Sequence, residues 1–395
     1  MFGTLIDYWH YTGDDTYNKI TKQAMVHQVG GTRDFMPENQ TRAMGNDDQG
    51  FWSLAAMSAA ETKFSDPAED EPQWLALVQA VFNEFTSRWD TENCGGGLRW
   101  QVFNFNVGWG YKNSISNGCF FNIATRLARY TGNDSYADWA EKVWDWEREV
   151  GLISDVFEVR DGVTIREGQE CKDDMDKTEW SYNSGIFLHG SAVMWNYTED
   201  QKWRDRVDGL LTHGMKKFSK DGVVIEQFCE PHDICDDDQR SFKGYYLRWL
   251  AATIQLVPDL HDTIIPLVKK SAEAAASVCI GSPTAPKPGH PPFDGIPGTA
   301  CGMRWTPQGE FDNSFGVGEQ MSALSAMTYV LVDSVAPPVT NATGGTSGGD
   351  PGAGGSDEEK VRVFEPLTTG DRVGAGFLTT LILAGVIGGT TFVVL

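Results

Sequence analysis

The chain has 395 residues, 41% of them hydrophobic, and contains 14 Trp, 21 Phe and 11 Tyr, which is enough apolar surface to bury a core. Its formal net charge is -23 at pH 7. Proteins bind nucleic acids and anionic membrane surfaces mainly by neutralising phosphates with Lys and Arg, so this charge argues against both as partners. Aromatic rings beside many Asp and Asn residues favour a sugar ligand, because rings stack on C–H faces while polar side chains bond hydroxyls.

A turn-and-helix phrase recurs along the chain and starts at Tyr11, Tyr130 and Tyr197. Each copy ends one apolar helix, turns through Gly, Asp or Asn, and caps the next helix with a short polar residue. Apolar residues then follow at helical spacing, as in 74–85 and 139–146. Helix pairs repeated roughly every 50 to 70 residues, with few strands, predict an all-α fold in which helical hairpins close into an (α/α)6 barrel, or toroid.

The first residues, MFGTLIDYWHYTGDD, are typical of the middle of an amphipathic helix rather than of a signal peptide. About five and a half helix pairs can be counted in place of six. We therefore expect the first helix to be truncated at this N-terminus. Residues 1–335 are predicted to form the barrel as one domain, and the strand-like run 156–165 is predicted to form a surface hairpin.

The cysteines lie in Asn-, Gly- and Pro-rich stretches that we expect to be loops, which indicates a disulfide framework in a secreted protein. Cys229 and Cys235 are the easiest pair to propose; the other pairings are not deducible, and the odd number leaves one thiol unpaired. No C-x-x-C pair occurs and His is scarce nearby, so neither a metal site nor a cofactor is expected. Four N-x-S/T sequences supply candidate glycosylation sites at Asn39, Asn133, Asn196 and Asn341.

The C-terminal region has the composition of a processing signal. Residues 336–373 are predicted to be a Gly/Ser/Thr-rich linker and anchor-site spacer, with small residues for cleavage at 354–356. Residues 374–395 are uncharged, apolar and not followed by basic residues, which favours a glycosylphosphatidylinositol (GPI) anchor signal over a permanent membrane span. We therefore expect a protein on the extracellular face of the plasma membrane or in the cell wall, held to the membrane by this lipid.

The segment N-D-D-Q-G-F-W, residues 46–52, precedes an apolar helix and contains adjacent carboxylates. Acidic residues at a helix start commonly complement the helix dipole, and spacing alone favours that explanation. The aromatic residues that follow at once, with Asn/Lys/Trp-rich segments in later repeats, favour chemistry. Glycosidic cleavage needs one carboxyl to protonate the leaving oxygen and a second to attack the sugar or activate water, and a separation of about 5 to 5.5 Å predicts retention.

This segment is accompanied by G-G-L-R-W-Q (96–101), Y-K-N-S-I-S-N-G (111–118), W-S-Y-N-S-G (180–185) and S-F-K-G-Y (241–245). Together they resemble glycoside hydrolase family 76, the endo-α-1,6-mannanases, and most closely its fungal GPI-anchored cell-wall branch. The resemblance implies an (α/α)6 barrel, with Asp47 as nucleophile and Asp48 as general acid/base. It implies an α-1,6-mannoside substrate, including the mannose core of GPI glycans, and wall glucan as acceptor if the reaction is transglycosylation. The sequence does not distinguish transfer from hydrolysis.

Further residues in or near these motifs are candidates for sugar subsites, with loop packing or a solvated charge run as the alternative explanation. They are Asn46, Trp52, Trp100, Asn104, Lys112, Asn113, Tyr182, Asn183, Asp238 and Lys243. Two other functions compete with catalysis by two carboxylates. One is a glycan-binding or scaffolding cell-wall protein without turnover, which need not retain both Asp residues. The other is a metal-dependent enzyme with an Asp-rich motif, which a chelator would inhibit.

Overall fold

The computed structural model describes residues 1–166, 168–284, 292–306, 309–354 and 369–394, apart from the side chains of 371 and 384–394. This part of the chain contains twelve α-helices: α1 Phe2–Thr12, α2 Asn18–His27, α3 Asn46–Thr62, α4 Trp74–Ser87, α5 Ser114–Thr131, α6 Asp134–Val150, α7 Ser181–Thr198, α8 Gln201–Lys217, α9 Gln239–Leu256, α10 His261–Ser277, α11 Val317–Tyr329 and α12 Thr369–Val394.

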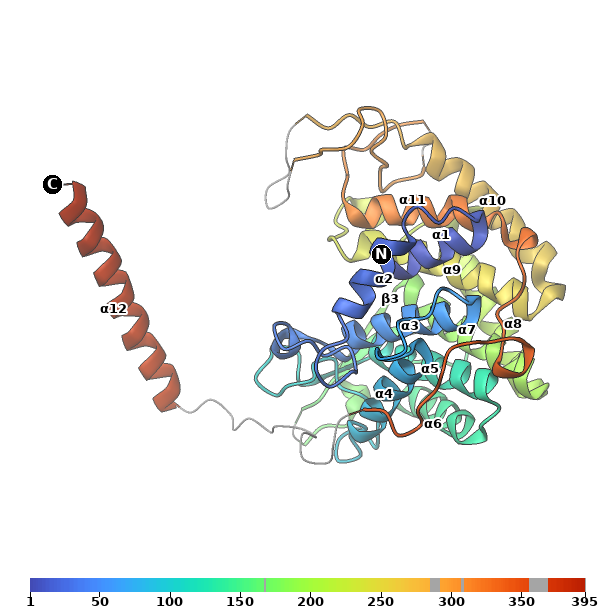
Figure 1. The fold of residues 1–395 in the computed structure, drawn as a ribbon, viewed down its shortest axis with the longest axis horizontal. Helices are drawn as coiled ribbons and strands as arrows, with labels where there is room; N and C mark the ends of the chain where they lie inside the picture. Colours follow the sequence, from blue (N-terminus) through green and yellow to red (C-terminus); the bar gives the residue numbers. More distant parts are fainter. Residues whose placement is uncertain (167, 285–291, 307–308, 355–368, 395) are drawn as a thin grey trace.

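Helices α1, α3, α5, α7, α9 and α11 stand side by side as an inner ring, which α1 closes by packing against both α3 and α11 (Figure 1). Helices α2, α4, α6, α8 and α10 pack on the outside of this ring. The described chain therefore forms an (α/α)6 toroid with six inner and five outer helices, which confirms the predicted fold class. Helix α1 has 11 residues, whereas the other inner helices have 13 to 18.

The two rings differ in sequence because they differ in exposure. The outer helix α6 buries one stripe, including Tyr136, Ala140 and Val143, and exposes charged residues elsewhere, as an amphipathic helix does. The inner helix α5 is buried on almost every side. Small residues allow the inner helices to approach closely: a Cβ added at Gly118 of α5 would lie 2.6 Å from Ile186 of α7.

Short strands lie at one end of the toroid. Strands β1 (Tyr111–Asn113), β2 (Arg160–Thr164) and β3 (Met175–Glu179) form an antiparallel sheet in that order. A second pair joins β4 (Ser219–Lys220) to β5 (Val223–Val224). The strand-like run 156–165 contains β2, but its partners lie outside the run: β2 pairs with β1 and β3, and Val159 bridges back to Ile153. Since β1 leads directly into α5, the three-stranded sheet lies where the inner helices begin.

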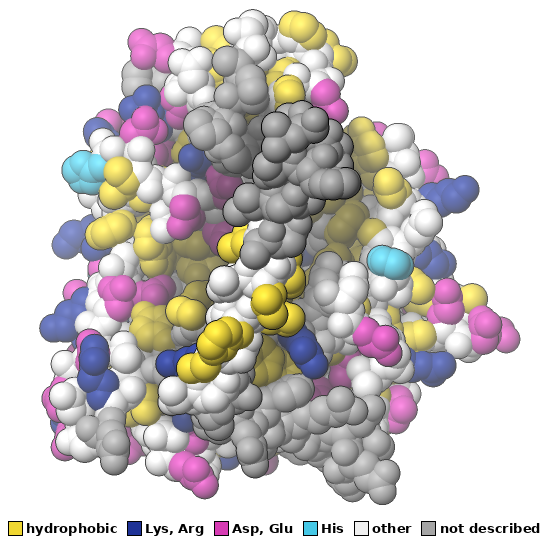
Figure 2. Space-filling view, turned by 90° about the vertical axis from the view of Figure 1, so that its left-hand side faces the viewer, with side chains coloured by type: hydrophobic (Ala, Val, Ile, Leu, Met, Phe, Trp, Pro, Cys, Tyr) yellow, Lys and Arg dark blue, Asp and Glu magenta, His cyan; other side chains and the backbone are white. Residues whose placement is uncertain are grey.

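The inner helices all start at the same end of the toroid, which faces left in Figure 1. Figure 2 looks toward this face; charged side chains are spread around its edge, and atoms in the foreground cover its centre. Helix N-termini carry unpaired N–H groups and partial positive charge, so they stabilise anionic side chains placed there. This end of the toroid is therefore suited to hold carboxylates.

Residues 337–354, the C-terminal strap, pack along the outer surface of the toroid. The backbone N–H of Val339 donates to the Glu61 carbonyl at 2.9 Å, and Ser347 Oγ accepts from the Leu75 N–H at 3.0 Å. Near its end, the Ala353 carbonyl accepts from Asn83 Nδ2 at 2.7 Å. The folded body therefore extends to residue 354, although the composition indicated a linker from 336. Hydrogen bonds hold most of the strap, and Val339 also packs against the hydrophobic core.

The region after the strap bears on the predicted anchor signal. Residues 355 and 356 of the proposed cleavage segment lie outside the described residues. Helix α12 covers most of the apolar run 374–395. In the described part of the chain, no helix meets the length and hydropathy needed to cross a membrane.

Three disulfides cross-link the toroid. They join Cys94 to Cys171, Cys229 to Cys235, and Cys279 to Cys301. The structure thus pairs Cys229 with Cys235 as the sequence analysis proposed. The unpaired thiol is Cys119, which is buried inside helix α5 rather than in a loop, so for this cysteine the expected location is wrong.

The four candidate glycosylation asparagines are all exposed. Asn39 precedes a short 3₁₀ turn, and Asn341 lies in the C-terminal strap. Asn133 caps helix α6 by accepting from the Ser135 N–H. The Asn196 side chain donates to the Leu256 carbonyl at 3.2 Å. Glycosylation remains a prediction at each of them, and Asn196 is the one whose amide nitrogen already holds another helix.

Candidate active site

Asp47 and Asp48 occupy the first turn of inner helix α3. The N–H of the capping residue Gly45 donates to Asp48 Oδ2 at 2.7 Å. The backbone of Gly45 is extended and open to any residue, yet a Cβ there would lie 2.2 Å from Asp47 Oδ1. Gly45 is therefore required for space: its bare backbone lets both carboxylates fold over the start of the helix.

Trp100 holds the other side of Asp47. Its indole Nε1 donates to Asp47 Oδ2 at 3.2 Å, and its carbonyl accepts from the Asn46 N–H at 2.8 Å. The indole ring rests on Gly108, whose φ of 99° and missing side chain allow this approach, because a Cβ there would lie 2.4 Å from the ring. Trp100 thus acts as a donor to Asp47, while its ring remains about one-third exposed, at 36%.

Burial and the neighbouring charge of Asp48 raise the pKa of Asp47 to about 7. Burial also raises the pKa of Asp48, although its side chain is the more exposed of the two. Asp47 Oδ1 is buried and makes no hydrogen bond. Two like charges so close together are unfavourable, so the pair holds one proton near neutral pH.

A third carboxylate, Asp161, was missed by the sequence analysis. Its charge and that of Asp47 both act on Tyr182, so the two carboxylates border one space, the catalytic cleft. The Tyr111 hydroxyl donates to Asp161 Oδ2 at 2.6 Å, and burial raises the pKa of Asp161. The Asn183 amide is buried without a well-formed hydrogen bond, yet it lies close enough to Asp161 to favour the charged form. Asp161 belongs to none of the quoted motifs; only the pairing of β2 with β1 brings it to the site.

Two further predicted residues face the carboxylates. Tyr182, in the first turn of α7, stacks on Phe242 with ring centroids 3.7 Å apart. Burial and the charges of Asp161 and Asp47 raise its pKa well above the usual range. Asp238, just before α9, has a pKa raised by partial burial and by nearby carboxylates that include Asp48. Helices α3, α7 and α9 thus contribute side chains to one cleft.

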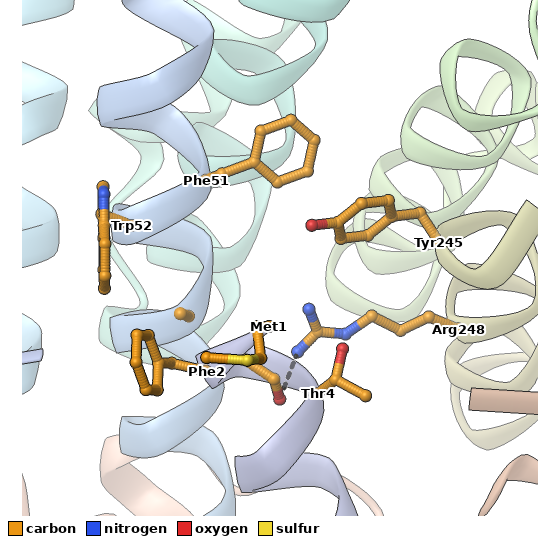
Figure 3. Close-up of a pocket in the computed structure, with 9 residues that line it drawn as sticks. Met1, Phe2, Thr4, Phe51, Trp52, Tyr245 and Arg248 are labelled. Atoms are coloured by element: carbon orange, nitrogen blue, oxygen red, sulfur yellow. Dashed lines mark hydrogen bonds between the residues drawn. The ribbon is translucent and has the colours of Figure 1, made fainter. Parts of the chain in front are cut away.

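The floor of this cleft lies one helical turn below Asp47. Phe51 of α3 and Tyr245 of α9 point toward each other there, with ring centroids 4.9 Å apart (Figure 3). Beneath them is a small cavity of about 210 Å³, to which Arg248 and the first residues of α1 contribute. Trp52 also lines this cavity and stacks on Phe2 with ring centroids 5.7 Å apart. Trp52 therefore packs the interior below the cleft instead of facing the carboxylates.

Two of the predicted subsite residues, Asn46 and Asn113, bond to the protein backbone or to other side chains. The Asn46 amide nitrogen donates to the Arg99 carbonyl at 2.8 Å, and its oxygen accepts from Arg88 at 2.9 Å. Asn113 caps helix α5 by accepting from the Ser116 N–H at 3.2 Å. Asn104 is partly buried in the loop that follows Trp100. Asn46 and Asn113 thus fix the geometry of the cleft and leave the contact with sugar to other side chains.

Both predicted lysines are fully buried. Lys112 Nζ donates to the carbonyls of Asp90 and Asn93 at 3.0 and 2.6 Å. Lys243 Nζ lies 3.1 Å from Glu230 and 3.8 Å from the centroid of the Trp305 ring. Because their ammonium groups are satisfied by protein atoms, neither lysine is available to bind a sugar hydroxyl. Sequence could not separate these roles, since Lys–Asn pairs suit both.

A metal site finds no support in the described residues, which contain no group of three or more His, Cys, Asp or Glu side chains arranged to hold an ion. A toroid with a pair of adjacent carboxylates at the start of an inner helix, beside aromatic side chains, is the architecture of a helical-barrel glycoside hydrolase.

The profile of glycosyl hydrolase family 76 matches residues 1–342, and the chain belongs to this family. It is 43% identical over 383 residues to the mannan endo-1,6-α-mannosidase DCW1 of Candida glabrata, covering 96% of this chain and 82% of the relative. It is 41% identical over 397 residues to the mannan endo-1,6-α-mannosidase DFG5 of Saccharomyces cerevisiae, covering 99% of this chain and 83% of the relative.

Solved structures share the fold, among them one from a fungus and one from a bacterium. The crystal structure of Dfg5 from Chaetomium thermophilum, in complex with glucosamine, is 47% identical with a TM-score of 0.82, covering 89% of this chain and 84% of that chain. The α-1,6-mannanase GH76A of Salegentibacter, as an inactive variant with α-1,6-mannotriose, is 17% identical with a TM-score of 0.65, covering 84% and 87%. At that identity the bacterial enzyme shows the common fold alone.

Proposed function

We propose that the protein cleaves internal α-1,6 linkages of mannoside chains, as a mannan endo-1,6-α-mannosidase, or transfers the mannosyl part to another sugar, as a transglycosylase. The observation that carries the proposal is the pair of adjacent carboxylates in one cleft: Asp48 accepts a hydrogen bond from the Gly45 N–H, and Asp47 accepts one from the Trp100 indole. Membership of glycosyl hydrolase family 76 and the names of the two fungal relatives support the substrate class.

In the proposed mechanism Asp47 attacks the anomeric carbon, and Asp48 protonates the leaving oxygen. Asp47 accepts from the Trp100 indole, and the backbone N–H groups at the helix start also favour its charged form. Asp48 is the more exposed and can exchange its proton with the departing sugar and with water. Burial favours the protonated form of Asp47 more than that of the exposed Asp48; a sugar that covers Asp48 desolvates it too and favours moving the proton there.

The intermediate in this mechanism is a mannosyl ester of Asp47. Asp48, now deprotonated, takes the proton from a hydroxyl that attacks the anomeric carbon, and the bond to Asp47 breaks, so the product retains its configuration. Water gives hydrolysis, and a sugar hydroxyl gives transglycosylation. We propose the mannose core of a GPI glycan as donor and wall glucan as acceptor. The glucosamine in the Chaetomium Dfg5 structure supports this donor, because GPI glycans join mannose to glucosamine.

The proposed location is the extracellular face of the plasma membrane and the cell wall, with attachment through a C-terminal GPI anchor. Three disulfides in the described chain support an oxidising compartment. The alternative is a glycan-binding or scaffolding wall protein that uses the same cleft without turnover. Asp47 is buried and its pKa is raised to about 7. Burying a carboxylate in this way costs stability, and a protein that only binds glycans has no need of it, so the observation favours the enzyme.

Incubation with α-1,6-mannooligosaccharides, followed by mass spectrometry, tests the proposal. Shortened or lengthened chains that disappear in both Asp47→Asn and Asp48→Asn are the expected result. Binding without any product from the unmodified protein contradicts the enzyme and supports the glycan-binding alternative. Adding a GPI-type glycan and a β-glucan oligosaccharide to the same reaction then separates transfer from hydrolysis, since transfer gives a mixed product.

A further inference from the structure

A second, larger cavity of about 1020 Å³ lies beside the catalytic cleft. Its walls come from the loop between α2 and α3, the last turn of α4 with the segment 88–93 that follows it, and the segment 99–109. Its volume is at the upper end of the range for cavities that hold drug-sized ligands, about 300 to 1000 Å³. Neither Asp47 nor Asp48 lines it, so the cavity is separate from the catalytic carboxylates.

A single extended segment forms the wall between the two spaces. Gly45 and Gln101 form an isolated antiparallel bridge, and the Trp100 carbonyl accepts from the Asn46 N–H. Side chains alternate along extended backbone, and here Arg99 and Gln101 line the cavity while Trp100 points to Asp47. A ligand in the cavity would therefore lie directly behind the residues that position the nucleophile.

The lining favours a neutral ligand rich in hydroxyls. Five carboxylates and three guanidinium groups border the cavity. Two of the arginines are already paired with lining carboxylates, Arg88 with Glu84 at 3.0 Å and Arg99 with Asp90 at 2.8 Å. A phosphate or an acidic sugar would face an excess of negative charge. Carboxylates that accept from hydroxyls, with Trp and Phe side chains in the same wall, are instead the components of a carbohydrate site.

We propose that this cavity is a second carbohydrate-binding site, which takes a neutral oligosaccharide behind the catalytic wall. The proposal rests on the proposed function for the chemical class of its ligand. The occupant is either a further stretch of the mannoside chain or a separate glucan chain, since both present the same hydroxyl-rich, uncharged surface.

Ser87 offers a way to fill the cavity, because it is exposed at the end of α4 and lines the cavity without touching Asp47 or Asp48. Binding is measured by calorimetry in the full chain carrying Asp47→Asn and Asp48→Asn, with α-1,6-mannotetraose and β-1,3-glucotetraose as separate titrants. We expect one of them to bind at a site that Ser87→Trp weakens at least tenfold. Ser65→Trp, an exposed serine outside the cavity, is expected to leave both titrations unchanged.

Loss of binding only for mannotetraose identifies a second mannoside site; loss only for glucotetraose identifies a glucan site. Glu38→Ala, at the cavity rim, is expected to weaken the same binding event several-fold, and thermal melting checks that each variant is folded. Identical isotherms with and without Ser87→Trp would overturn the inference. Failure of the proposed function appears separately, as the absence of products when the unmodified chain is incubated with α-1,6-mannotriose.

Discussion

The Trp100 indole donates to Asp47 Oδ2 at 3.2 Å while its ring lies against Gly108. This donor favours the ionised carboxylate, so it opposes the burial that raises the pKa of Asp47 to about 7. Trp100→Phe keeps a ring over Gly108 but removes the donor. We expect the acidic limb of the kcat/KM profile to move to higher pH by up to about one unit, because a hydrogen bond to a charged group contributes roughly 1.5 kcal/mol. Trp109→Phe, in the same loop, is the control; an unmoved limb in Trp100→Phe contradicts this role.

Gly45→Ala tests whether activity depends on the position of the two carboxylates, because it should move them without destabilising the fold. The backbone of Gly45 accepts alanine, but the new Cβ would clash with Asp47 Oδ1 at 2.2 Å. We expect kcat to fall by about 100-fold, since a displacement of about 1 Å can have this effect, while the melting temperature changes little. Gly348→Ala is the matched control, because the nearest atom to its added Cβ, in the Gln73 side chain, lies 3.5 Å away. Full activity in Gly45→Ala would refute the spatial argument.

Azide rescue assigns the roles within the pair. Asp47→Ala is expected to be inactive until azide replaces the nucleophile, and an activated α-mannoside then yields the β-mannosyl azide. Asp48→Ala is expected to form the ester with such a substrate and to yield the α-mannosyl azide. NMR distinguishes the two anomers. The reverse pattern would exchange the roles of Asp47 and Asp48.

Because of Glu147, we expect the free energy of unfolding to depend on pH. It is fully buried in α6, and this burial raises its pKa from 4.5 to about 8. Between these values the folded chain keeps a proton that the unfolded chain releases, so the free energy of unfolding falls as pH rises from about 4.5 to 8. Glu147→Gln should flatten part of this slope in denaturant unfolding. Burial raises the pKa of Glu226 to about 8 as well, so some slope should remain. Glu149→Gln, exposed on the same helix, should leave the slope as it is.

The C-terminal strap is expected to stabilise the toroid. Ser347 Oγ accepts from the Leu75 N–H in the first turn of α4, which has no side-chain cap of its own. Ser347→Ala should cost about 1 kcal/mol and lower the melting temperature by about 1 °C. Thr346→Ala, whose partner Asp66 lies on the exposed side, should have a smaller effect. Equal melting temperatures for Ser347→Ala and the unmodified chain would show that the strap contributes little.

The parts of this molecule that follow local rules could be predicted from sequence. Helix periodicity and the repeated turns predict the toroid, and the position of Asp47 and Asp48 before an apolar helix places them at the start of α3. Contacts between distant segments could not be predicted in this way. Asp161 reaches the cleft only through strand pairing, and the burial of Lys112 depends on the loop that folds over it. The Gly-rich strap resembled a linker because polar backbone contacts leave no hydrophobic pattern.

The central claim is that this carboxylate pair cleaves an α-1,6-mannosidic bond with retention of configuration. Proton NMR of the first product formed from α-1,6-mannotetraose, recorded before the sugar mutarotates, tests it most directly. The account predicts that the α-anomer appears first and that the β-anomer grows in only as mutarotation proceeds. Initial appearance of the β-anomer would contradict the covalent intermediate on Asp47 and would require one carboxylate to activate water instead.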